Sequence, residues 1–77
     1  MNEAGKAAMF DKRYDEALVA FTRAVALDPT PGHYFNLGVA QYQLGQCAAA
    51  LASFDRVLDS NADQALKEKT RKMKERC

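Results

Sequence analysis

The chain of 77 residues contains no tryptophan and no isoleucine, and it has only one histidine, two prolines and two cysteines. Valine and threonine together supply seven residues, whereas alanine supplies fourteen. Because strands favour β-branched and aromatic residues while helices favour alanine, this balance argues against an all-β fold and favours helices. Two cysteines are too few for a disulfide-dense scaffold, and their separation matches no zinc-binding spacing.

A long apolar run and a strong net charge are also lacking. No stretch of about 18 apolar residues is present to span a membrane. The formal net charge is +1, from 11 basic and 10 acidic residues, so the overall charge does not point to nucleic acid. The hydrophobic fraction of 48% is that of an ordinary globular domain. At this length we expect one domain with a marginal core, because a chain of this size buries only about 60% of its unfolded surface.

Arrangements of residues that carry out catalysis or bind metals are lacking as well. His33 is the only histidine, and neither Ser53 nor Ser60 is placed to form a nucleophile–base pair with it. The acidic residues are scattered singly, and the four glycines form no phosphate-binding loop. We therefore expect no catalytic residues, no metal site and no cofactor.

Apolar residues recur at helical spacing along most of the chain. One stripe with the spacing of a helix face consists of Tyr14, Ala17, Leu18, Phe21, Ala24 and Val25. This helix should end at Leu27 and Asp28, because Pro29 cannot continue it. A linker at residues 29–32 then leads into a second helix from about His33 to Leu44, and Gly45 is a natural left-handed stop.

Three further helices are expected from the same pattern. The stripe of the Tyr14 helix is repeated from Cys47 to Leu58, and a weaker one runs from Asn2 to about Lys12. The pair Ser60 and Asp63 resembles a capping box, which would start a last helix that continues to the C-terminus.

The chain also resembles itself when it is shifted by 33 residues. The identical pairs are Gly5 and Gly38, Ala7 and Ala40, Ala17 and Ala50, Leu18 and Leu51, Phe21 and Phe54, and Arg23 and Arg56. A period in the low thirties that contains two helices is typical of a helical solenoid.

These residues resemble the tetratricopeptide repeat family, whose signature is W-x2-L-G-x2-Y, then A-x3-F, then P. The second unit reads Tyr34-x2-Leu37-Gly38-x2-Gln41 and then Ala50-x3-Phe54, and the first closes with Ala17-x3-Phe21 and Pro29. The departures from the signature are Ala8, Gln41 and Cys47 in place of aromatic residues and Ala62 in place of the closing proline.

The resemblance implies an all-α fold, a fragment of an α-solenoid with about five antiparallel helices in a single domain spanning residues 1–77. The first repeat would span residues 1–30, the second residues 31–62, and a capping helix residues 63–77. The expected structural positions are Gly5, Ala17, Phe21, Pro29, Gly38, Ala50 and Phe54. Small residues there let helices approach closely, and truncating either phenylalanine to alanine should cost about 3–5 kcal/mol.

In this family the first helix of each pair lines a concave groove that holds peptides. The resemblance therefore implies a non-catalytic module that binds a peptide or a partner protein. The groove residues would be Asn2, Lys6, Met9, Phe35, Asn36, Val39, Tyr42 and Gln43. The subclass that clamps the carboxylates of chaperone tails is not matched. Only Asn36 falls where the clamp would place an asparagine, and Asn2 and Lys6 are the wrong residue types at their places.

A structural alternative stays open for the same surface. Phe35 and Tyr42 could be covered by a second copy or by adjoining repeats, which would make the chain a self-associating scaffold unit or part of a longer array. Two repeats are fewer than the roughly three usually needed for independent stability. The first helix would also leave Met1, Ala4 and Ala8 exposed, so we expect a homo-oligomer or a fragment.

Positive charge is concentrated near the C-terminus. Residues 64–77 contain six basic and two acidic side chains. We expect mainly a solvated helix face, because cations near a helix C-terminus are stabilised by its dipole. Binding to an anionic surface is the weaker alternative, and nucleic acid is not favoured, because no aromatic residues lie between the basic ones to stack on bases.

The spacing of the two cysteines predicts a disulfide. Cys47 and Cys77 lie at similar distances before and after a turn centred near Asn61, so two antiparallel helices would bring them together. Leu66, Thr70, Met73 and Cys77 share one stripe of the last helix, and Cys47 opens the apolar stripe of the preceding one. An oxidised pair would favour a bacterial periplasm or cell envelope, and two free thiols would favour the cytoplasm.

Overall fold

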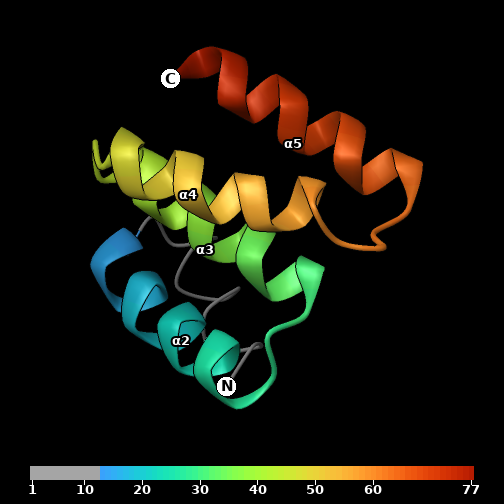
Figure 1. The fold of residues 1–77 in the computed structure, drawn as a ribbon. Coiled ribbons are helices and arrows are strands. Elements are labelled where there is room, and N and C mark those ends of the chain that lie inside the picture. Colours follow the sequence, from blue (N-terminus) through green and yellow to red (C-terminus); the bar gives the residue numbers. More distant parts are fainter. Residues whose placement is uncertain (1–12) are drawn as a thin grey trace.

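The computed structural model describes residues 13–77, and this part of the chain contains four α-helices and no strand (Figure 1). The helices are α2 (Tyr14–Leu27), α3 (Pro31–Gln43), α4 (Cys47–Leu58) and α5 (Gln64–Arg76). The expected all-α fold is confirmed. The helix predicted from Asn2 to about Lys12 lies outside the described residues.

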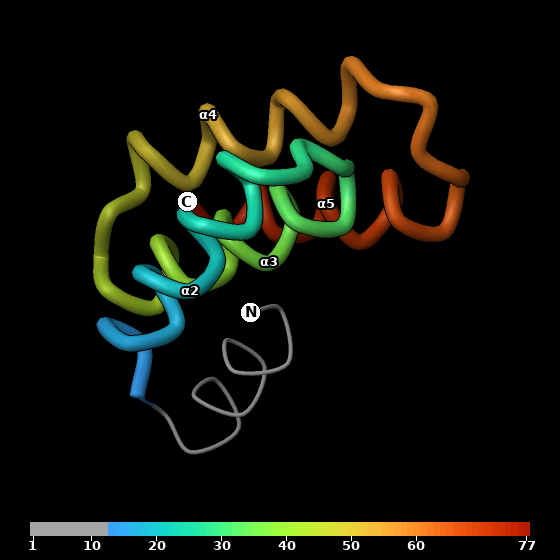
Figure 2. Tube along the Cα trace, turned by 90° about the horizontal axis from the view of Figure 1, so that it is seen from below, coloured from blue at the N-terminus to red at the C-terminus, as the bar shows by residue number. Residues whose placement is uncertain are grey.

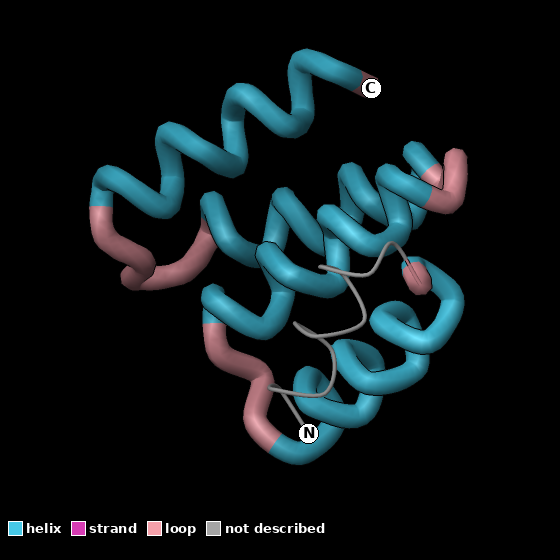
Figure 3. Tube along the Cα trace, turned by 180° about the vertical axis from the view of Figure 1, so that it is seen from behind, coloured by secondary structure: helices cyan, strands magenta, loops and turns pink. Residues whose placement is uncertain are grey.

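Consecutive helices are joined by short loops and pack against each other in chain order (Figure 3). Helix α3 contacts both α2 and α4, whereas α5 packs mainly on α4 and also touches α3. Figure 2 shows α3 and α5 on the same side of α4. The order of contacts is that of a helical array, in which each helix rests on its neighbours.

The core consists of small and aromatic residues at repeated positions. Ala17 and Phe21 of α2 are buried against α3, where Leu37 and Ala40 complete the cluster. In α4, Ala50 and Phe54 stand 33 residues further along and are also fully buried. An alanine and a phenylalanine are thus buried at equivalent positions of α2 and α4. The burial of each phenylalanine contributes about 1.5–3 kcal/mol to folding.

The start of α3 differs from the prediction. The helix begins at Pro31, two residues before His33, so the second half of the predicted linker is helical. The Thr30 hydroxyl accepts a hydrogen bond from the His33 backbone N–H at 3.3 Å, which caps the helix. Pro31 occupies the first helical position, where a missing N–H costs nothing and the fixed φ angle suits a helix.

The end of α3 is the left-handed stop expected at Gly45, whose φ angle is +77°. The Gly45 N–H donates to the Tyr42 carbonyl at 3.0 Å, and the Gln46 N–H donates to the Gln41 carbonyl at 2.8 Å. These two bonds form a Schellman motif, which satisfies carbonyls that the helix end would leave unpaired. The chain then reverses at once into α4.

The predicted capping box at Ser60 was wrong. The Ser60 hydroxyl donates to the Val57 carbonyl at 2.6 Å and accepts from the Ala62 N–H at 3.2 Å, so it belongs to the turn after α4. Asp63 is the residue that caps α5, because its carboxylate accepts from the Leu66 N–H at 2.8 Å. A hydroxyl bonded to the preceding turn cannot also serve the next helix.

The 33-residue spacing extends to α5. Helix α3 begins at Pro31 and α5 begins at Gln64, and both contain 13 residues. Their caps, Thr30 and Asp63, each accept from the backbone N–H three residues later. Helix α5 therefore corresponds in register to α3, as the first helix of a further unit would.

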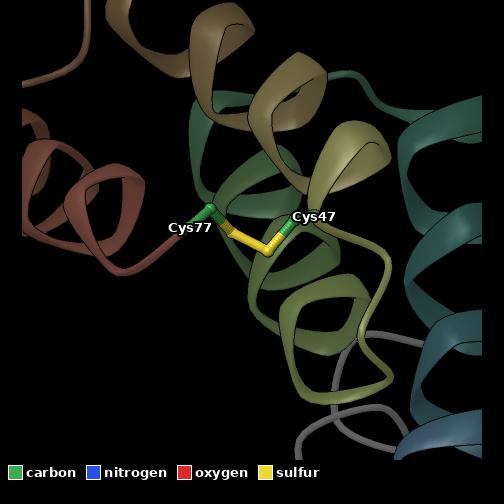
Figure 4. Close-up of a disulfide and its surroundings, with 2 residues drawn as sticks. All are labelled: Cys47 and Cys77. Atoms are coloured by element: carbon green, nitrogen blue, oxygen red, sulfur yellow. A yellow bond between two sulfur atoms is a disulfide. The ribbon is translucent and has the colours of Figure 1, made fainter.

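Helix α5 is held on α4 by one buried stripe and by a cross-link. Thr70 is fully buried, and Leu66 and Met73 beside it are half-buried. Cys47 at the start of α4 and Cys77 at the end of α5 are joined by a disulfide, with their Cα atoms 5.7 Å apart (Figure 4). The pairing predicted from the spacing is thus present, and it fastens the far end of α5.

Candidate functional site

The orientation of α3 is set by its contacts with α4. Gly38 lies directly against the Phe54 ring, and the Phe35 and Phe54 rings have their centroids 6.1 Å apart. The Ser53 hydroxyl donates to Gln41 Oε1 at 2.7 Å. The side of α3 that contains Phe35, Gly38 and Gln41 is therefore directed toward α4.

The opposite flank of α3 is directed toward α2 through Leu37 and Ala40, which belong to the core cluster with Phe21. One stripe of α3 remains that neither contact uses. At about 100° per residue, Asn36, Val39 and Gln43 fall within an arc of about 60°. Asn36 and Val39 are half-buried and Gln43 is exposed, so this stripe reaches the surface.

The groove residues expected from the sequence divide into two sets. Asn2, Lys6 and Met9 lie outside the described residues. Phe35, Asn36, Val39 and Tyr42 are all on α3 and all half-buried. Phe35 is tilted by 46° against the Phe54 ring, so its side chain also contributes to the contact between the two helices.

Helix α5 presents its basic residues in two stripes on opposite sides. The first stripe consists of Lys67, Arg71 and Lys74, which fall within an arc of about 60°. The second consists of Lys69, Lys72 and Arg76, which fall within another arc of about 60° on the other side of the helix. The buried Thr70 lies between the two stripes. All three side chains of the second stripe are exposed, whereas Lys67 and Lys74 of the first are half-buried.

Two hydrogen bonds show which side of α5 each stripe occupies. Lys74 Nζ donates to Asp55 Oδ1 at 2.6 Å in an ion pair, so the first stripe is directed toward Asp55. Asp55 and Ser53 project from nearly opposite sides of α4, about 160° apart, and Ser53 bonds to α3. The second stripe is consequently on the side of α5 that is directed toward α3.

The sequence pattern predicted a solvated face for the last helix and did not separate Lys69, Lys72 and Arg76 from its other basic residues. These residues are 33 positions after Asn36, Val39 and Gln43 of α3. A second application of the same shift would have found them. The signal is hidden because Leu37 and Gly38, which identify the helix, correspond to Thr70 and Arg71.

A concave feature lies where the start of α3 meets the end of α4. It has a volume of about 460 Å³ and is lined by Pro29, Pro31, Tyr34, Arg56, Asp59 and Ser60. The Arg56 guanidinium carbon lies 6.0 Å from the centre of the Tyr34 ring, a cation–π contact that occupies part of this space. None of the expected groove residues lines it.

The described residues offer little for catalysis. His33 Nδ1 donates to the Asp28 carbonyl at 2.6 Å, so the ring ties α3 to the loop before it. Across residues 13–77, no three histidine, cysteine, aspartate or glutamate side chains gather closely enough to hold a metal ion. Within the same part of the chain, no helix is both long and apolar enough to cross a membrane.

Comparison with known proteins gives one finding. A family model described as "Tetratricopeptide repeat" matches residues 2–65, which is most of the chain. No curated protein and no solved structure matches the chain.

Proposed function

The chain belongs to the tetratricopeptide repeat family, whose repeats generally mediate protein–protein interaction, and we propose that it binds a peptide or partner protein in a groove lined by α3 and α5. Members of this family are typically non-catalytic, and we propose the same for this chain. The two repeats would span residues 1–30 and 31–62, with residues 63–77 as the capping helix.

One observation carries this proposal. Helices α3 and α5 touch each other on one side of α4, 33 residues apart in register, and each has a stripe that its contact with α4 does not use. Equivalent stripes of adjacent helices together form a continuous surface. That surface combines the apolar Val39 with the polar Asn36 and the charged Lys69, and a mixture of apolar and polar groups suits an extended peptide.

Site-specific photocrosslinking tests the proposal. A photoreactive phenylalanine analogue replaces Val39 in one variant and Asp55, on the far side of α4, in the other. After irradiation in an extract of the source cells, we expect position 39 to give discrete products with another protein and position 55 to give none. Equal labelling from both positions, or no product from position 39, would contradict a groove on α3.

A self-associating scaffold unit is the second candidate function. It is supported by Val19 and Leu27 of α2, which are 54% and 70% exposed although both are apolar. In the same experiment with the purified protein, self-association predicts a product of twice the chain mass. Sedimentation equilibrium would then show a dimer whose population rises with concentration, whereas a monomer at all concentrations would exclude this candidate.

A further inference from the structure

We propose that the disulfide between Cys47 and Cys77 is a redox switch. A dithiol reductant opens the bond in the folded protein, and α5 then leaves α4 while α2, α3 and α4 keep their fold. The inference starts from the difference between the way α5 is held and the way the other three helices are held. It needs no ligand, so it stands apart from the proposed function.

The apolar core of the described residues lies in α2, α3 and α4. Every buried apolar side chain belongs to one of these three helices, and Phe21, Phe54 and Val57 are the largest. Helix α5 supplies only the buried Thr70, whose hydroxyl donates to the Leu66 carbonyl of the same helix at 2.7 Å. The three other helices therefore retain their common core when α5 moves away.

Polar contacts add little to the docking of α5. Within residues 13–77, one hydrogen bond joins α5 to the other helices, and it is the ion pair between Lys74 and Asp55. These two side chains are 35% and 56% exposed, and an ion pair at such exposure contributes little to stability. Apolar contact comes from Leu66 and Met73, which are only half-buried. The disulfide is consequently the strongest link between α5 and α4.

The bond lies where a reductant can reach it. Cys77 follows the last residue of α5 and is exposed, and Cys47 is half-buried at the start of α4 (Figure 4). The rate of thiol–disulfide exchange depends on access to the sulfur atoms, and exposed disulfides are the labile ones. No unfolding has to precede the reaction here.

The reaction is an exchange with a dithiol in two steps. A thiolate of the reductant attacks Cys77 Sγ, the sulfur of the more exposed cysteine, and the S–S bond breaks. The electron pair of that bond leaves on Cys47 Sγ, which takes up a proton. The second thiol of the reductant then attacks the reductant's own sulfur in the mixed disulfide and releases the Cys77 thiol. Two electrons and two protons pass to the protein, and the reductant becomes a disulfide.

Release of α5 uncovers an apolar stripe of α4. At about 100° per residue, Leu51 and Leu58 lie between the directions of Cys47 and Asp55, the two residues of α4 that bond to α5. Both leucines are half-buried with α5 in place. Reduction thus exposes these leucines and, at the same time, removes the α5 wall of the proposed groove.

Hydrogen exchange followed by mass spectrometry tests the switch on the intact chain. The oxidised protein is compared with protein kept in dithiothreitol. On reduction we expect peptides from α5 to exchange at least about tenfold faster, because α5 opens as a separate unit. Peptides from α2 and α3 should stay within about twofold of their rates in the oxidised protein, because their core is intact.

Two variants serve as controls. The variant Cys47→Ser/Cys77→Ser should exchange like the reduced wild type and should not respond to dithiothreitol. The variant Asp55→Asn loses the ion pair but keeps the disulfide, and its α5 should exchange within about twofold of the oxidised wild type. Fast exchange of α5 in oxidised Asp55→Asn would show that the ion pair holds the helix, and it would overturn the inference.

The rate of reduction tests whether the bond opens in the folded state. Thiols are trapped with iodoacetamide at successive times, and we expect the rate to rise in proportion to the dithiothreitol concentration. A rate that is independent of this concentration would show that unfolding comes first and would contradict the switch. After the dithiol is replaced by oxidised glutathione, we expect slow exchange of α5 to return.

Two results of the exchange measurement would overturn the inference. Unchanged exchange of α5 after reduction would show that packing alone holds the helix. Fast exchange in every helix would show that the bond supports the whole fold. The measurement contains no peptide ligand, so its outcome does not depend on whether α3 and α5 form a binding groove.

Discussion

A Cβ atom placed on Gly38 would lie 2.5 Å from Cε1 and 2.8 Å from Cδ1 of the Phe54 ring, so the contact between α3 and α4 has no room for a side chain at position 38. Phe54 is fully buried and cannot swing away without disturbing its neighbours. This one contact fixes how α3 lies on α4, and so which stripe of α3 is directed away from α4.

We therefore expect Gly38→Ala to destabilise the protein. Overpacking in a core costs about 1–3 kcal/mol, and the higher helix propensity of alanine recovers up to about 1 kcal/mol of that. Urea unfolding followed by circular dichroism measures the difference. The matched control is Gly32→Ala, also in α3, where the added carbon meets nothing within 4 Å. This substitution should stabilise by about 0.5–1 kcal/mol. Equal effects of the two would contradict the close contact.

The same contact predicts coupling between the two positions. Phe54→Ala alone should cost about 3–5 kcal/mol because it leaves a cavity. In that background the additional change Gly38→Ala should cost nothing or stabilise, since the ring it would strike is gone. A double-mutant cycle on the four proteins measures the coupling. Additive free energies of unfolding would show that Gly38 and Phe54 do not constrain each other.

The disulfide should make a large contribution to stability. Joining Cys47 to Cys77 closes a loop with a sequence separation of 30, which in the chain-entropy model stabilises by about 3–4 kcal/mol. The double variant Cys47→Ser/Cys77→Ser should therefore unfold at much lower urea concentration. Adding a dithiol reductant should lower the urea midpoint of the wild type but leave that of the variant unchanged.

Mass spectrometry of the native protein tests the bond itself. Without reductant we expect no thiol to react with iodoacetamide, and after reduction we expect two. An oxidised pair would favour maturation in an oxidising compartment such as a bacterial periplasm or cell envelope. Two alkylated thiols in the unreduced protein would rule out the bond and remove the basis for that compartment.

The cap of α5 provides a local test. Asp63→Ala should cost about 0.5–2 kcal/mol, because the Leu66 N–H loses its acceptor. Hydrogen exchange should speed up in the first turn of α5 and stay unchanged in α3, whose cap is Thr30. Thr30→Ala should give the converse pattern. Unchanged exchange at Leu66 after Asp63→Ala would show that the carboxylate is not the cap.

Much of the fold could be predicted because the signals are local. The stripe from Tyr14, the stop at Gly45 and the start of α4 at Cys47 each follow from helical spacing or from a glycine with a positive φ angle. The cysteine pairing needed only helix lengths on both sides of one turn. Each of these features depends on a few residues that are close in sequence, so tertiary packing did not change them.

The errors arose where one residue has two possible roles. Pro31 suggested a linker but is compatible with the first position of a helix, and Thr30 decides between them. Ser60 resembled a cap, yet its hydroxyl is used by the turn before it. The basic stripe of α5 was hidden for a different reason: Leu37 and Gly38, which identify α3 as a repeat helix, correspond to Thr70 and Arg71 in α5, so the repeat is hard to recognise there.

Nuclear magnetic resonance on the ¹⁵N-labelled protein, titrated with the tightest-binding peptide from a phage-display selection on the intact protein, tests most directly whether α3 and α5 form the binding groove. We predict that the largest amide shift changes fall on Asn36 and Val39 of α3 and on Lys69 and Lys72 of α5, and that they saturate together. The largest changes at Val19 or Asp55, or in the concave feature lined by Tyr34, would place binding elsewhere and contradict a groove on α3 and α5.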